Sequence, residues 1–173
     1  MTELNQTGLT QAALEALAAE LGAALAERGW RVAAAESCTG GWAAQALTAI
    51  AGSSVWFERG FVTYSNAAKQ EMLGVGAATL AEHGAVSEAT VREMAAGALR
   101  HGRADAAFAI SGIAGPGGGT PDKPVGTVCF AWALAGQAPD SECCRFTGDR
   151  QAVRAAAVAH ALAGMRRRLP AMP

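Results

Sequence analysis

The sequence has no long apolar run and no excess of charge of one sign. Fourteen Lys and Arg residues face 15 Asp and Glu residues, so the formal net charge is −1, which disfavours a broad nucleic-acid surface. No apolar stretch is long enough to span a membrane, and residues 1–7 lack the basic start and apolar core of a signal peptide. We therefore expect a cytoplasmic protein without membrane or nucleic-acid partners.

Grouped metal ligands are also missing from the sequence. The four cysteines, Cys38, Cys129, Cys143 and Cys144, form no Cys-x-x-Cys pair and no zinc-like spacing. The three histidines fit neither a ligand pattern nor a Ser-His-Asp triad. We expect four reduced thiols, as is usual in the cytosol. Cys143 and Cys144 are adjacent, so in a strand they point to opposite faces.

The order of the apolar segments predicts the fold class. Strands are expected over residues 30–35, 57–64, 105–111, 125–134 and 141–147. Helices are expected over 10–28, 67–73, 77–83, 87–100 and 149–169, and one more from Cys38 or Thr39 to Ile50. Strands and helices alternate at first, and two strands then follow each other closely. This order predicts a three-layer α/β/α sandwich with a mixed sheet flanked by helices on both sides. The expected single domain spans residues 1–173, with 1–8 as a flexible N-terminus.

The stretch Ala35-Glu36-Ser37-Cys38-Thr39-Gly40-Gly41 joins an expected strand to an expected helix. Such a turn lifts a side chain out of the core and directs the free N–H groups of the helix at whatever lies there. Ser37 is therefore a candidate nucleophile beside an oxyanion or phosphate site. The alternative is that a hydroxyl here only caps the helix.

Tyr64, the only tyrosine, ends an expected strand shortly before Lys69, which lies in the next helix. A lysine near a helix N-terminus feels the positive end of the dipole, and partial burial would lower its pKa enough for it to act as a base. The alternatives are a half-buried strand aromatic and a solvated lysine. Without a histidine in a triad pattern, a nucleophilic serine would depend on such a lysine or tyrosine.

Two further segments are candidates for anion binding. The loop that contains Gly112, Gly115, Gly117 and Gly118 has little side-chain bulk, and its N–H groups could form an anion nest; a plain turn is the alternative. Arg150 lies near the start of the last helix, where it could reach a phosphate or carboxylate or form an ion pair with Asp149.

Together these segments resemble one family, the CinA C-terminal domain, also known as competence/damage-inducible protein or nicotinamide-nucleotide amidohydrolase. The resemblance covers nearly the whole chain in order. It lies in residues 35–41, 52–54, 64–66 with Lys69, 73–75, 84–87, 111–118, 123–128, Phe146 and 148–150. Ser111 stands where the family usually has Thr, so the hydroxyl is kept. The larger N-terminal domain of many family members has no counterpart here, which implies the stand-alone form.

The resemblance implies hydrolysis of nicotinamide mononucleotide to nicotinate mononucleotide and ammonia, without a metal or organic cofactor. Ser37 would be the nucleophile, assisted by Tyr64 and Lys69, and Cys38 is the rejected rival. The implied substrate-binding residues are Thr39, Gly40, Gly41, Ser111, Gly112, Gly115, Gly117, Gly118 and Arg150.

Two other functional classes remain open: a non-catalytic nucleotide-binding or regulatory module linked to competence or DNA damage, and a DNA-associated factor, which the charge balance disfavours. We also expect a homodimer, with the apolar helix over residues 10–28 packing on the partner.

Overall fold

A mixed sheet forms the centre of the protein, which we describe from a computed structural model covering residues 3–4 and 9–171. The six strands lie in the order β1-β6-β5-β4-β2-β3. Their bounds are β1 Glu3–Leu4, β2 Val32–Glu36, β3 Phe57–Val62, β4 Ala106–Gly112, β5 Thr127–Leu134 and β6 Asp140–Phe146. Strand β2 pairs in parallel with β3 and β4, whereas β5 pairs antiparallel with both of its neighbours, β4 and β6. The predicted mixed sheet is confirmed.

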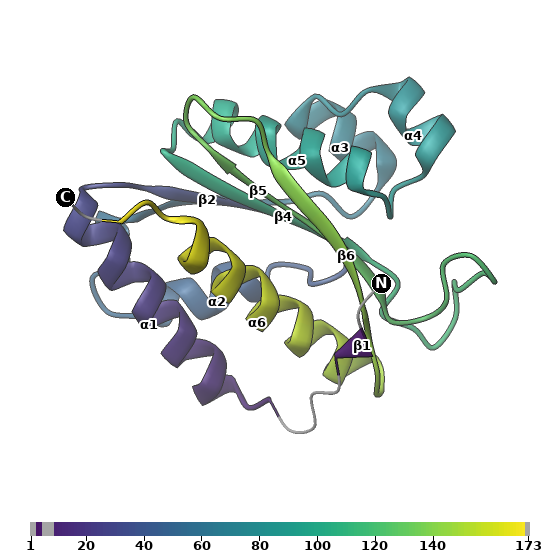
Figure 1. The fold of residues 1–173 in the computed structure, drawn as a ribbon, viewed down its shortest axis with the longest axis horizontal. Helices are drawn as coiled ribbons and strands as arrows, with labels where there is room; N and C mark the ends of the chain where they lie inside the picture. The colour runs from purple at the N-terminus through teal and green to yellow at the C-terminus, as the bar shows by residue number, and fades with distance from the viewer. Residues whose placement is uncertain (1–2, 5–8, 172–173) are drawn as a thin grey trace.

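Helices cover both faces of this sheet, as predicted (Figure 1). One face carries α1 Gln11–Arg28, α2 Trp42–Thr48 and α6 Arg150–Arg168; the other carries α3 Asn66–Leu73, α4 Ala77–His83 and α5 Glu88–Gly102. A short 3-10 helix, Ser53–Val55, precedes β3. In the part of the chain that the structure describes, no helix combines the length and apolar character needed to cross a membrane.

Side chains on the two faces of β2 pack into two separate hydrophobic cores. Ala34 packs into the core under α1, α2 and α6, whereas Ala33 and Ala35 pack into the core under α5. This is the period of two that a strand imposes. All five residues of β2 are buried, and the apolar run of its first four residues is typical of a strand covered on both faces. The carboxyl end of β2 is therefore held rigidly from both sides.

The apolar side chains of α1 pack against other elements of the same chain. Leu14, Leu21 and Leu25 are fully buried in the core that α1 shares with α6. The side chains that suggested packing on a partner are thus already covered, and the expected homodimer loses that support.

The N-terminal segment takes part in the sheet through Glu3 and Leu4, which pair in parallel with Arg145 and Phe146 of β6. The rest of the segment expected to be flexible, residues 1–2 and 5–8, lies outside the described residues.

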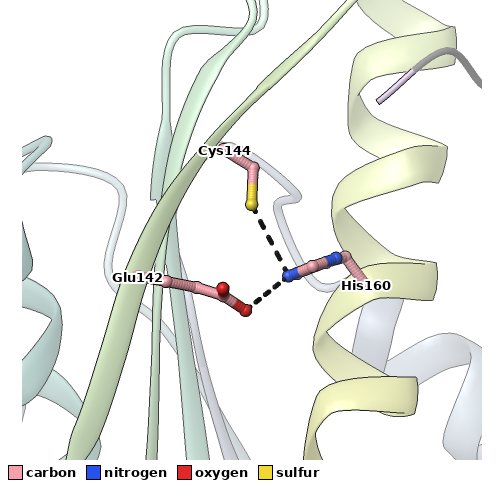
Figure 2. Close-up of side chains that lie close together, drawn as sticks. All are labelled: Glu142, Cys144 and His160. Carbon is pink, nitrogen blue, oxygen red and sulfur yellow. Dashed lines mark hydrogen bonds and ion pairs between the residues drawn. The ribbon is translucent and has the colours of Figure 1, made fainter. Parts of the chain in front are cut away.

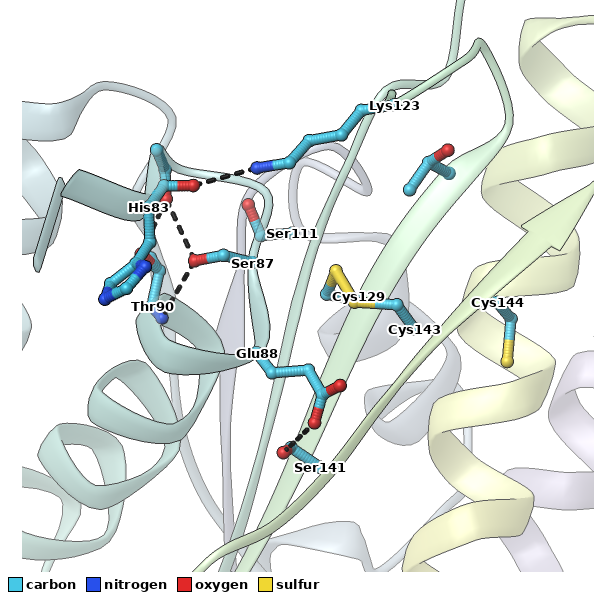
Figure 3. Close-up of a disulfide and its surroundings, with 12 residues drawn as sticks. His83, Ser87, Glu88, Thr90, Ser111, Lys123, Cys129, Ser141, Cys143 and Cys144 are labelled. Atoms are coloured by element: carbon cyan, nitrogen blue, oxygen red, sulfur yellow. Dashed lines mark hydrogen bonds between the residues drawn. A yellow bond between two sulfur atoms is a disulfide. The ribbon is translucent and has the colours of Figure 1, made fainter. Parts of the chain in front are cut away.

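The expectation of four reduced thiols is wrong for two of the cysteines. Cys129 of β5 lies directly opposite Cys143 of β6, with Cα atoms 4.0 Å apart, and the two form a disulfide (Figure 3). Their pairing follows from the antiparallel register, which no local sequence pattern reveals. Cys38 and Cys144 are free and buried. Cys144 points away from the disulfide toward α6, as its neighbouring position predicted.

Candidate active site

The end of β2 brings Ser37 and Lys69 together. The N–H of Ser37 donates to the Ile110 carbonyl at 2.9 Å, which extends the pairing of β2 with β4 by one residue. Lys69, from the first turns of α3, places its Nζ 3.0 Å from Ser37 Oγ and 2.8 Å from the carbonyl oxygen of Thr63. The hydroxyl and amine that the sequence singled out are therefore in direct contact.

Lys69 is 1% exposed, although it is an amine on a short helix. Burial disfavours the ammonium form and lowers the pKa of Lys69 below its usual 10.5. A neutral amine can donate one hydrogen bond to Thr63 and still accept the proton of Ser37 through its lone pair. The pair has the geometry and the electrostatics of a nucleophile with its base.

Helix α2 begins at Trp42, three or four residues later than the predicted start at Thr39 or Cys38. Gly40 and Gly41 have φ angles of 60° and 98°, a left-handed conformation that glycine adopts readily. Because this conformation is not that of a right-handed helix, α2 begins only after Gly41. The cap is also different from the expected Ser or Thr. The fully buried carboxylate of Glu36 accepts hydrogen bonds from the N–H groups of Gly41, Ala43 and Ala44 at 2.8–3.1 Å.

This carboxylate changes the electrostatics of the turn. The N–H groups expected to point at a ligand are occupied by Glu36, so the start of α2 is not an open anion site. Sequence reasoning missed Glu36 because a carboxylate at the end of a buried strand carries no local motif. The available signal was a charged residue directly after four buried apolar positions, since such a charge needs partners.

Cys38 is a weak rival to Ser37 as nucleophile. Burial raises the pKa of the Cys38 thiol to about 11, and the nearby Arg154 guanidinium opposes this shift only in part. The thiol is therefore protonated at neutral pH, whereas a nucleophilic cysteine needs a thiolate.

Two arginines at the start of α6 tie the surrounding segments together. Arg150 donates to the Tyr64 hydroxyl at 3.0 Å and to the Gly115 carbonyl at 2.9 Å. Arg154 donates to the carbonyls of Cys38 and Thr39 at 3.0 and 2.9 Å. Asp149 caps α6 instead of pairing with Arg150. Arg154 was missed, although its spacing of four from Arg150 places both on one helix face.

A cavity of about 360 Å³ opens beside these arginines. Its walls are Trp42, Arg150, Gln151 and Arg154, and the Arg154 guanidinium lies 5.3 Å from the centre of the Trp42 ring. The volume falls within the usual range for small-molecule sites. The cavity combines an aromatic surface with two cations.

The remaining predicted residues lie in different settings. Tyr64 is 62% exposed, and its hydroxyl contacts Arg150. Thr39 is fully buried, and its hydroxyl has no partner within the described part of the chain. The buried Ser111 donates to the Ala85 carbonyl at 2.7 Å. Gly112 ends β4, and the exposed Gly117 and Gly118 lie in the loop beyond it.

Known proteins match the chain over nearly its whole length. Residues 14–169 match the model of the CinA C-terminal domain. Nicotinamide-nucleotide amidohydrolase PncC from Escherichia coli K12 is 59% identical over 155 residues, 89% of this chain and 93% of that protein.

Two solved structures share the fold. The competence/damage inducible protein CihA from Agrobacterium tumefaciens has a TM-score of 0.86 at 47% identity, with 88% of this chain and 93% of that one covered. The competence-damaged protein (CinA) superfamily protein from Escherichia coli has a TM-score of 0.88 at 40% identity, with 95% and 94% covered. In sequence and in fold, the chain belongs to the CinA C-terminal domain family.

Proposed function

We propose that the chain deamidates nicotinamide mononucleotide to nicotinate mononucleotide and ammonia. The observation that carries the proposal is the contact of 3.0 Å between Lys69 Nζ and Ser37 Oγ. The relative at 59% identity is named a nicotinamide-nucleotide amidohydrolase, which supplies the substrate class. The contact between Lys69 and Ser37 supports their proposed roles as base and nucleophile.

In the first half of the reaction, Ser37 Oγ attacks the carboxamide carbon while Lys69 accepts the hydroxyl proton. The tetrahedral intermediate then collapses, the C–N bond breaks, and Lys69 returns the proton so that the nitrogen leaves as ammonia. In the second half, Lys69 deprotonates a water molecule that attacks the acyl ester. The nicotinate product leaves, and the hydroxyl of Ser37 is regenerated.

The arginine-lined cavity provides a place for the rest of the nucleotide. A phosphate pairs well with guanidinium groups, and Arg150 and Arg154 both line the cavity. In this proposal Trp42 gives the ribose or pyridine an apolar surface. Binding energy from the phosphate end would orient the carboxamide at Ser37.

Tyr64 is assigned a supporting role at the mouth of the site. Its hydroxyl is fixed by Arg150, so movement of Arg150 toward a phosphate would bring the phenol with it. Ser111, Thr39 and the glycines at 40, 41, 112, 115, 117 and 118 are proposed to shape the pocket walls.

Ammonia release from nicotinamide mononucleotide by the purified chain tests the proposal. Because Ser37→Ala removes the attacking oxygen, we expect its kcat/KM to fall by at least about 10³-fold, a loss typical of a nucleophile replacement. The Ser37→Ala protein should still bind the nucleotide in calorimetry, because the arginine cavity is unchanged.

Cys38→Ala is the matched control, since it changes the adjacent side chain and leaves Ser37 in place. We expect it to keep most of the activity. Full activity in Ser37→Ala together with loss in Cys38→Ala would overturn the assignment. Nucleotide binding without turnover by the native chain would favour the non-catalytic module.

A further inference from the structure

Three metal-ligating side chains converge between β6 and α6, away from the Ser37 site. Glu142 and Cys144 lie two residues apart on β6, so both point to the same face of the strand. His160 of α6 points at them from the helix (Figure 2). The three ligand atoms lie within 4.8 Å of one another.

Both β6 side chains approach the same nitrogen of the imidazole. His160 Nε2 lies 2.9 Å from Glu142 Oε1 and 3.7 Å from Cys144 Sγ. A Cys-His-Glu catalytic triad would instead use the two nitrogens of the ring separately. Without a metal, the Nε2 atom of His160 carries an ion pair with Glu142 and a long hydrogen-bond contact with the sulfur of Cys144.

The spacing is close to that of a tetrahedral zinc site. Zinc bonds of about 2.0 Å to nitrogen or oxygen and about 2.3 Å to sulfur place the ligand atoms roughly 3.3–3.6 Å apart. The separations from His160 Nε2, 2.9 Å to Glu142 Oε1 and 3.7 Å to Cys144 Sγ, lie on either side of that range. In the proposed site, side-chain rotation brings the three ligand atoms, which lie within 4.8 Å of one another, around one ion.

The surroundings hold His160 and Cys144 in place and leave the side of Glu142 open to solvent. The His160 ring lies 4.6 Å from the Phe130 ring and 5.9 Å from that of Phe146, which fixes its orientation. Cys144 is buried, whereas the Glu142 side chain is 42% exposed. An ion could enter from the side of Glu142, where a water molecule could complete four-coordination.

We propose that Glu142, Cys144 and His160 form a binding site for Zn²⁺ that clamps β6 to α6. Sulfur, imidazole and carboxylate together suit this ion better than Mg²⁺ or Ca²⁺, which take oxygen ligands. On binding, the thiol of Cys144 gives its proton to solvent and its sulfur bonds the metal. The site is independent of the proposed deamidation, which uses none of these residues.

The test is metal titration of the full chain after chelator treatment and dialysis. Calorimetry with Zn²⁺ should give one ion per chain, and saturating Zn²⁺ should raise the thermal midpoint, because the ion binds only the folded state. Co²⁺ should give thiolate-to-metal charge transfer and the intense visible bands of a tetrahedral site. No binding, or Co²⁺ spectra without the charge-transfer band, would overturn the proposal.

Variants separate this cluster from other donors. Glu142→Gln changes a half-exposed side chain, so it should fold normally and bind Zn²⁺ at least about tenfold more weakly, as even outer-shell changes do. Cys144→Ala should abolish the charge-transfer band. The matched controls, Cys38→Ala and the exposed His101→Gln, should bind like the native chain. Unchanged binding in Glu142→Gln and Cys144→Ala, or loss in the controls, would contradict the proposal.

Discussion

Among single residues, Lys69 carries the proposal that a lysine takes the place of a catalytic histidine. Its amine is buried, contacts Ser37 and has its pKa lowered by desolvation. A lowered pKa means that the neutral, basic form appears at lower pH than in a solvated lysine. The same burial therefore provides both the position and the protonation state that a general base requires.

The pH dependence of activity tests this role. We expect kcat/KM to rise with pH as Lys69 loses its proton, with a midpoint below 10.5. Lys69→Met should lose activity by at least about 10²-fold, as expected for a general base. Initial rates of ammonia release across the pH range provide the measurement.

Lys69→Arg serves as the control for this prediction. Arginine keeps the positive charge and the hydrogen-bond donors but does not deprotonate. It should therefore be inactive at every pH. Substantial activity in Lys69→Arg would show that Lys69 acts through its charge and not as a base.

Thr39 offers a separate test at this scale, because its buried hydroxyl has no partner in the described part of the chain. An unpaired buried hydroxyl costs about 1–3 kcal/mol. Thr39→Val keeps the shape and removes the hydroxyl, so the free energy of unfolding in urea should stay constant or rise.

Thr90→Val is the matched control, since Thr90 is equally buried and donates to the Gly84 carbonyl at 2.7 Å. It should lose about 1 kcal/mol or more. An equal fall in the free energy of unfolding of the two variants would contradict the absence of a hydrogen-bond partner for the Thr39 hydroxyl in the described part of the chain.

Among secondary-structure elements, α2 depends on a residue outside itself. Glu36 accepts three N–H groups at the start of this short helix, and hydrogen bonds to a charged acceptor are the stronger ones. Glu36→Gln turns one acceptor oxygen into a donor that faces backbone donors. We expect the free energy of unfolding to fall by at least about 2 kcal/mol in urea denaturation.

Glu71→Gln, an exposed change on α3, provides the comparison and should stay within about 0.5 kcal/mol of the native chain. Because Ser37 directly follows Glu36, activity should fall in Glu36→Gln and not in Glu71→Gln. Native stability in Glu36→Gln would mean that α2 does not depend on the carboxylate.

The elements also show what the sequence alone could predict. The apolar run of β2 and the order of strands and helices were readable because each depends on local chemistry. The start of α2 was misplaced because the conformations of Gly40 and Gly41 depend on the turn as a whole. The Glu36 cap was missed because its partners lie five to eight residues away.

Contacts between distant elements were the least predictable. Ser37 and Lys69 were singled out by position and family resemblance, but only the fold brings the two atoms together. The disulfide was missed because Cys129 and Cys143 meet through strand register. The cluster of Glu142, Cys144 and His160 was missed because it joins a strand to a helix.

In the whole molecule, α6 connects segments that are far apart in sequence. Its first two turns hold the turn after β2 through Arg154, and Tyr64 and Gly115 through Arg150. Its middle carries His160 over β6. Any change that shifts α6 against the sheet is therefore expected to alter both the proposed active site and the proposed metal site.

The disulfide gives a prediction for the stability of the whole chain. Cys129 and Cys143 are separated by 14 positions, and closing a loop of this size stabilises a fold by about 3 kcal/mol in the chain-entropy model. The double variant Cys129→Ala/Cys143→Ala should therefore lose up to about 3 kcal/mol in urea denaturation. Both residues also line a cavity of about 450 Å³, so a small reductant should destabilise the native chain similarly.

Thiol counting separates the disulfide from other sources of stability. In denaturant without reductant, two thiols, Cys38 and Cys144, should react with a thiol reagent; after reduction, four should react. The stability of the double variant should not respond to reductant, since the crosslink is already absent. Four reactive thiols in denaturant without reductant would show that β5 and β6 are held by their hydrogen bonds and packing alone.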